Sequence, residues 1–167
     1  MGSRWHLLLP KIKPSVNVLI LNRGAHYVTD DILVTELNQT FTYLSEFHPN
    51  ISIIFRSTSI GHSNWQTQRL NAPLLSETDA DVSEVTNSQT KYNWDSFSRQ
   101  KSLVKALIDE YHPHIIFLDI YPSTARRADL HTIEDGLHYC LPGLIDNWVR
   151  LLDTTMTLVL SKGKNIS

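Results

Sequence analysis

Three short apolar runs constrain the fold more than any other feature of this sequence. They are VNVLILN at 16–22, ISIIF at 51–55 and HIIFLDIY at 114–121. A continuous apolar run, as opposed to an alternating one, indicates a strand that is buried on both faces of a parallel sheet. Parallel strands need crossover connections, which are usually helices. The sequence therefore predicts an α/β fold.

A helical pattern follows the first of these runs. Thr29 or Asp30 is expected to cap this helix, and the His-Pro-Asn sequence at 48–50 is expected to end it. Apolar residues recur on one side at spacings of four, four and three, which is typical of a helix that packs on a sheet. This stripe consists of Leu33, Leu37, Phe41 and Leu44.

Two further helices are expected later in the chain. The first precedes the third apolar run and carries a stripe of Leu103, Leu107 and Tyr111. The second is LIDNWVRLLDTTMTLVL, and the Pro-Gly pair at 142–143 is expected to open it, because proline suits the first turn of a helix. The order of strands and helices predicts right-handed crossovers in one sheet.

The chain of 167 residues is long enough for one domain with a substantial core, which we expect to span residues 1–167. A long polar segment at about 63–95 has no clear period and is expected to form a loop. Loops of this length in compact domains are usually functional or disordered.

Composition excludes several classes of protein. The 15 basic and 17 acidic residues give a net charge of −2, so no nucleic acid partner is expected. No run reaches the roughly 18 apolar residues of a membrane span, and the start of the chain lacks the apolar core of a signal peptide. Cys140 is the single cysteine, which excludes a disulfide within the chain.

The residues with chemical potential follow the three apolar runs. Asn22 and Gly24 come after the first run, and the segment 56–62 comes after the second. Asp135 and His138 lie in the loop after the third. The carboxyl ends of parallel strands meet at one edge of the sheet, where ligands bind, so we expect these stretches to converge there.

Asp135 and His138 have the spacing of two members of a catalytic triad. In a D-x-x-H turn the carboxylate can reach back to the imidazole Nδ1, which leaves Nε2 free to accept a proton from a hydroxyl nucleophile. Gly136 gives this turn conformational freedom. The alternative is a loop acid beside a half-buried histidine, because such pairs recur by chance.

Four other residues are candidates for binding. The amide of Asn22 and the backbone N–H of Gly24 could donate to an oxyanion, although both residue types are also common where a strand ends in a turn. Arg56 and His62 could bind polar groups of a substrate, although the arginine could instead pair with a nearby acid.

Two other kinds of site are not favoured. Cys140 is not expected to be a nucleophile, because nothing obvious in its context lowers the pKa of its thiol. No metal site is expected from His112, His114 and His131, since no carboxylate–histidine spacing typical of metal ligands accompanies them.

Several motifs together resemble those of a known family. DGLHYCLPGLIDNW, at 135–148, resembles the C-terminal block of the PC-esterase group in the SGNH (GDSL-like) hydrolase superfamily. This group includes the plant trichome-birefringence-like polysaccharide O-acetyltransferases. VLILNRGAHY resembles the group's N-x-G-x-H block, IIFRSTSIGH resembles its F-R-T-x-S-x-G-H block, and YNWDSF is a weaker match. The resemblance covers about residues 13–152.

The resemblance implies a fold and a chemistry. The fold is a three-layer parallel sheet with helices on both faces. The chemistry is transfer or removal of acyl groups, usually acetyl, on glycan hydroxyls through an acyl-serine intermediate, with no metal, nucleotide or other cofactor. The partner would be a glycan or an acylated carbohydrate, and the compartment would be the Golgi or the secretory pathway.

The resemblance also assigns roles to the matching residues. His138 would be the general base and Asp135 its orienting partner. Asn22 and Gly24 would form the oxyanion hole, and Arg56 and His62 would lie near the substrate.

The sequence departs from the family pattern in two ways. The G-D-S block that carries the nucleophilic serine is absent, and Gly136 replaces the first cysteine of the last block. In the superfamily the strand order is 2-1-3-4-5, so the chain is expected to be an N-terminally truncated domain that lacks the first two strands. The strand at 16–22 would then be an exposed edge through which the chain could associate with a partner.

Three interpretations of function remain open at this stage. The first is acyl transfer or ester hydrolysis by a Ser-His-Asp triad whose serine is not in this chain. The second is a catalytically inactive relative that binds a glycan or a protein. The third is an α/β domain in which Asp135 and His138 are structural.

Overall fold

The computed structural model describes residues 8–24, 29–62, 66, 94–132 and 134–163, so most of the expected loop at 63–95 lies outside the described residues. Three strands form one sheet: β1 (Val18–Leu21), β2 (Ser52–Arg56) and β3 (Ile116–Leu118). The α-helices are α2 (Asp30–Phe47), α5 (Phe97–Tyr111), α6 (Tyr121–Ala125) and α7 (Leu144–Gly163). Short 3₁₀ turns occupy Leu9–Lys11, Trp94–Ser96 and Ala128–Leu130.

The sheet is parallel throughout, as the apolar runs predict. Its order is β1-β2-β3, with Val18 opposite Ser52 and Ile54 opposite Ile116. The central strand β2 has three fully buried positions, whereas β1 lies at an edge of the described sheet. The order β1-β2-β3 is the order expected if these strands are the last three, 3-4-5, of a sheet with strand order 2-1-3-4-5.

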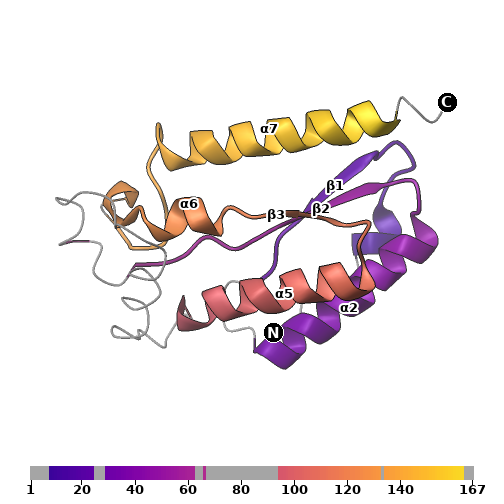
Figure 1. The fold of residues 1–167 in the computed structure, drawn as a ribbon, viewed down its shortest axis with the longest axis horizontal. Coiled ribbons are helices and arrows are strands. Elements are labelled where there is room, and N and C mark those ends of the chain that lie inside the picture. Colours follow the sequence, from indigo (N-terminus) through magenta and orange to yellow (C-terminus); the bar gives the residue numbers. More distant parts are fainter. Residues whose placement is uncertain (1–7, 25–28, 63–65, 67–93, 133, 164–167) are drawn as a thin grey trace.

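Helices cover both faces of the sheet, which confirms the expected three-layer arrangement. Figure 1 shows α2 and α5 on one side of the strands and α7 on the other. The α7 side chains that pack toward the sheet are Trp148, Leu152 and Met156. Among the described helices, none is both long enough and apolar enough to cross a membrane.

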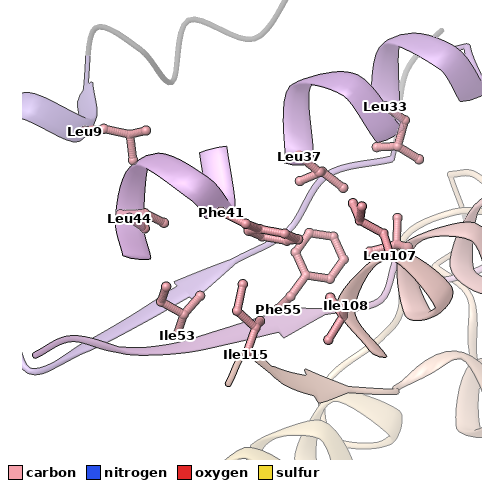
Figure 2. Close-up of a cluster of buried hydrophobic side chains, with 11 residues drawn as sticks. Leu9, Leu33, Leu37, Phe41, Leu44, Ile53, Phe55, Leu107, Ile108 and Ile115 are labelled. Atoms are coloured by element: carbon pink, nitrogen blue, oxygen red, sulfur yellow. The ribbon is translucent and has the colours of Figure 1, made fainter. Parts of the chain in front are cut away.

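The larger core cluster lies between the sheet and the pair α2 and α5 (Figure 2). The expected stripe on α2 is confirmed, because all four of its members have no exposed surface: Leu33, Leu37, Phe41 and Leu44. Phe41 meets Phe55 of β2 edge to face, with ring centroids 5.8 Å apart. Thr29 precedes α2, as expected, but its side chain makes no capping hydrogen bond.

The expected stripe on α5 is wrong for two of its three members. Leu103 is 37% exposed and Tyr111 is 64% exposed. The stripe that is buried starts earlier and includes a polar residue, Gln100, whose amide donates to the Asp30 carboxylate at 3.2 Å. A prediction that considers only apolar residues does not identify a buried polar residue such as Gln100. The buried residues of α5 are Phe97, Gln100, Val104, Leu107 and Ile108.

The end of the third strand and the place of Pro142 also differ from expectation. The strand predicted at 114–121 ends at Leu118, because the Asp119 carboxylate accepts the Tyr121 N–H at 3.1 Å and α6 begins there. The last helix begins at Leu144, as its predicted sequence does, but Pro142 lies before its first turn and not within it. The Asp146 carboxylate accepts the Gly143 N–H at 2.7 Å and so satisfies a donor at the start of α7.

Candidate active site

The D-x-x-H turn closes a short antiparallel ladder. His131 bridges Tyr139, the Thr132 N–H donates to the His138 carbonyl at 2.9 Å, and the Cys140 N–H donates to the Leu130 carbonyl at 2.9 Å. Backbone hydrogen bonds therefore fix both sides of the turn that carries Asp135 and His138.

Asp135 uses both carboxylate oxygens within the turn. Oδ1 accepts the backbone N–H groups of Leu137 and His138, each at 2.8 Å, and Oδ2 lies 2.7 Å from Nδ1 of His138. Partial burial acts to raise the pKa of Asp135, but the hydrogen bonds from His138 and Leu137 outweigh burial and hold this pKa below its usual value. The carboxylate is therefore ionised at neutral pH and can accept a hydrogen bond from a protonated Nδ1 of His138.

His138 presents its other ring nitrogen to solvent. Its side chain is 73% exposed, and no described side chain forms a hydrogen bond with Nε2. Since a carboxylate only accepts, Asp135 selects the tautomer with the proton on Nδ1, which leaves a lone pair on Nε2. That arrangement suits a general base, as the spacing predicted.

His62 lies inside the protein. It is 2% exposed, its Nε2 lies 2.9 Å from the Ala125 carbonyl, and its Nδ1 lies 2.6 Å from Nε2 of His131. Burial lowers the pKa of His62. Both ring nitrogens are engaged, so in this conformation neither is available to a substrate. The backbone N–H of His62 donates to the Gly136 carbonyl at 2.8 Å, which joins the segment after β2 to the D-x-x-H turn.

His131 is a site residue that the sequence interpretation missed. Its Nδ1 lies 3.1 Å from the His138 carbonyl, and its ring stacks on Tyr139 with centroids 4.2 Å apart. Burial and the neighbouring His62 lower the pKa of His131 to about 4. The only signal in the sequence was one more histidine just before the motif, and nothing local indicated its pairing with a residue 69 positions away.

Arg56, the last residue of β2, contacts helix α7. Its guanidinium sits over the ring of Trp148 at 5.8 Å, and that ring meets Tyr139 edge to face at 5.6 Å. Burial lowers the pKa of Arg56. Among the described residues Arg56 forms no ion pair with a carboxylate, so its partner in this part of the protein is an aromatic ring.

Asn22 and Gly24 pack against the residues that follow β2. The Nδ2 of Asn22 donates to the Arg56 carbonyl at 2.8 Å and to Oγ1 of Thr58 at 3.2 Å, so both of its hydrogens have acceptors. Gly24 has φ +142°, and a Cβ there would lie 2.7 Å from Thr58 Oγ1. Both the conformation and the close approach therefore require glycine at this position.

The segment 56–62 links the predicted site residues. Arg56 and Thr58 contact Asn22, whereas His62 contacts the turn at Gly136. No hydrogen bond in the described part of the chain joins Asn22 or Gly24 directly to Asp135 or His138. The segment 56–62 thus connects the two groups, Asn22 through Arg56 and Thr58, and the D-x-x-H turn through His62.

Of the three histidines considered for a metal site, His112 and His114 lie together, with ring centroids 6.1 Å apart, and His131 lies elsewhere. His112 contacts Asn38 and His114 contacts Ser45, both on α2, whereas His131 pairs with His62. Within the described ranges, no group of three His, Cys, Asp or Glu side chains is arranged to hold a metal ion.

Comparison with protein families identifies one whose model covers most of the chain. The model of the PC-Esterase family, a GDSL/SGNH-like acyl-esterase family found in Pmr5 and Cas1p, matches residues 23–155. These 133 positions (155 − 23 + 1) are most of the 167 residues and include the D-x-x-H turn, Arg56 and His62, whereas Asn22 lies just outside. No curated protein matches the chain.

Proposed function

Because this chain belongs to the PC-esterase family of GDSL/SGNH-like acyl-esterases, we propose that it provides the base and the orienting acid of an acyl-transfer site. The observation that supports this proposal is the 2.7 Å contact between Asp135 and Nδ1 of His138, with Nε2 exposed. The proposed substrate is an acyl ester of a carbohydrate, with acetyl as the acyl group and a polysaccharide as its carrier.

In the proposed reaction His138 acts twice. Its Nε2 removes the proton from a serine hydroxyl as the serine oxygen attacks the ester carbonyl, and the imidazolium then protonates the departing sugar oxygen. An acyl-serine remains. Nε2 next removes a proton from water or from an acceptor sugar hydroxyl, which attacks the acyl-serine and releases the serine with its proton restored. Asp135 stabilises the imidazolium in both steps.

We propose that Gly24 and Asn22 stabilise the oxyanion. The backbone N–H of Gly24 has no acceptor among the described residues, so this donor is available. Asn22 would have to exchange its longer contact, the 3.2 Å hydrogen bond to Thr58, for one to the oxyanion. An oxyanion is the stronger acceptor, because hydrogen bonds to ionised groups are about twice as strong as neutral ones.

The proposed serine comes from outside the described residues. Ser57 lies at the end of β2, but it is 1% exposed and its hydroxyl donates to the Asp119 carboxylate at 2.8 Å. The same oxygen accepts the backbone N–H groups of Ile120 and Tyr121, so Ser57 is held as a structural link between two loops. No described serine contacts His138.

The edge strand β1 could pair with additional β-strands. We propose that residues 1–167 form one domain and that further strands, from this or another polypeptide, pair with β1. Support comes from the position of β1 at the edge of the described sheet and from Ile20, which is 43% exposed on it. An unpaired apolar edge favours strand addition.

A second candidate function is glycan binding without catalysis. It is favoured by the lack of a described serine at His138 and by the cation–aromatic pair of Arg56 and Trp148, since aromatic rings commonly bind sugars. Under this proposal the site would hold acylated glycan without releasing the acyl group.

Release of acetate from an O-acetylated polysaccharide tests the two candidates. The protein is compared with His138→Gln and with His114→Gln, which removes an exposed imidazole bound to α2. Acyl chemistry predicts acetate release that His138→Gln lowers by at least about a hundredfold and His114→Gln leaves unchanged. Retained polysaccharide binding with no acetate release, by the protein as isolated from its source, would favour the binding module.

A further inference from the structure

The buried pair of His62 and His131 lies between two carbonyl groups. The contacts run from the Ala125 carbonyl to Nε2 of His62 at 2.9 Å, between the two rings at 2.6 Å, and from Nδ1 of His131 to the His138 carbonyl at 3.1 Å. His62 is 2% exposed and His131 is 1% exposed. This chain of contacts therefore joins α6 to the backbone of the proposed base through buried imidazoles.

The number of protons limits which contacts are hydrogen bonds. Each carbonyl only accepts, so a contact at either end is a hydrogen bond only if the nitrogen facing the carbonyl carries a proton. Two neutral imidazoles carry two protons, whereas the three contacts need three. Burial lowers the pKa of both rings, that of His131 to about 4, so a third proton is gained only in acid. Two facing lone pairs 2.6 Å apart would repel each other, so the contact between the rings keeps a proton, and in the neutral pair the nitrogen at one of the two carbonyl ends lacks one.

The contact at the Ala125 end is the shorter, 2.9 Å against 3.1 Å, but the surrounding negative charges favour a proton at the His138 end, on Nδ1 of His131. Asp129 acts on both rings, but Asp135 acts on His131 alone, so negative potential is greater on that side. Asp129 is also paired with Arg127 through two contacts of 2.9 Å, which weakens its effect. The other groups facing the pair are the ring of Tyr139 and the thiol of Cys140, which contacts the His131 carbonyl at 3.5 Å.

We propose that His131 is a positioning residue for His138. In this proposal His131 donates its Nδ1–H to the His138 carbonyl, and His62 donates its own Nδ1–H to Nε2 of His131. Together with the His62 backbone N–H on Gly136, the pair then holds the D-x-x-H turn at two points. The catalytic meaning of this role rests on the proposed function of His138, but the hydrogen bonds themselves do not.

The tautomers can be read from imidazole ¹⁵N NMR of the whole chain at about pH 8, above the usual imidazole range. The proposal expects Nδ1 of His131 and Nδ1 of His62 to carry protons. A bare Nδ1 on His131 would overturn it. This measurement needs no variant and no substrate, so it stands even if His138 proves to have no part in acyl transfer.

Two substitutions at position 131 then test the positioning role. The side-chain nitrogen of Asn occupies about the place of Nδ1, and that of Gln about the place of Nε2, so His131→Asn keeps the donor to His138 and His131→Gln loses it. The readout is the ratio of Nδ1–H to Nε2–H tautomers of His138. We expect a ratio within about twofold of the unmodified protein for Asn, and a ratio lower by roughly three- to tenfold for Gln.

Equal ratios in the two variants would refute the positioning role. Amide hydrogen exchange of Val104, a buried residue of α5, serves as the control for global unfolding. If His131→Gln does not fold, the tautomer of His131 in the unmodified protein decides the question alone.

Discussion

Asp135→Asn should reverse the tautomer preference of His138. The substitution keeps the shape of the side chain and the oxygen that accepts the N–H groups of Leu137 and His138 at 2.8 Å, so the turn should persist. It replaces Oδ2, which lies 2.7 Å from Nδ1, by an NH₂ group that can only donate. Nδ1 must then accept, and the ring proton moves to Nε2.

The size of this effect follows from one hydrogen bond. A hydrogen bond to a charged group contributes about 1.5–3 kcal/mol, and exposure of the His138 side chain, at 73%, places this one at the lower end of the range. About 1.4 kcal/mol corresponds to a tenfold change in an equilibrium constant. We therefore expect the ratio of Nδ1–H to Nε2–H tautomers of His138 to fall by roughly tenfold or more in Asp135→Asn.

Imidazole ¹⁵N chemical shifts at about pH 8 measure this ratio directly, and circular dichroism checks that the fold is retained. An unchanged tautomer ratio in a folded Asp135→Asn protein would refute the claim that Asp135 orients His138. It would also remove the physical basis for assigning His138 as a base.

Three further predictions concern the scaffold and its response to pH. Phe41→Ala should lower the free energy of unfolding by about 3–5 kcal/mol, because Phe41 has no exposed surface, whereas Phe47→Ala, at a side chain that is 63% exposed, should change it by less than about 0.5 kcal/mol in urea titrations. Gly24→Ala should destabilise by about 1–3 kcal/mol in the same assay, since the added Cβ meets Thr58 at a positive φ. The pKa of His131 is about 4 in the folded protein and about 6.5 when unfolded, so the unfolded state binds more protons between these values, and stability should fall as pH drops from about 6.5 to about 4. His131→Asn should reduce this fall, and a pH profile identical to that of the unmodified protein would contradict the assigned pKa shift.

The sequence predicted those elements whose pattern is local. The strands have mostly apolar runs, and the stripe on α2 has apolar residues at a helical spacing, so each could be recognised from neighbouring residues alone. The stripe on α5 was misplaced because a polar residue, Gln100, occupies a buried position, where its amide NH₂ donates to the carboxylate of Asp30 on another helix. No local pattern carries that information, because the partner lies 70 residues away in the chain.

The same distinction applies to the site. The contact between Asp135 and His138 spans three residues, and the spacing alone predicted it. The pairing of His62 with His131 depends on how the segment after β2 meets the D-x-x-H turn, and a single sequence does not show that meeting. His62 was therefore expected to face a substrate, whereas the structure surrounds it with protein groups.

Labelling with a serine-directed fluorophosphonate, applied to the protein as isolated from its source, tests the central claim most directly. The account predicts that one serine is labelled and that His138→Gln abolishes labelling while circular dichroism stays unchanged, because only Nε2 of His138 can activate that serine. Labelling that persists in a folded His138→Gln protein, or a complete lack of labelling in the unmodified protein, would contradict the account.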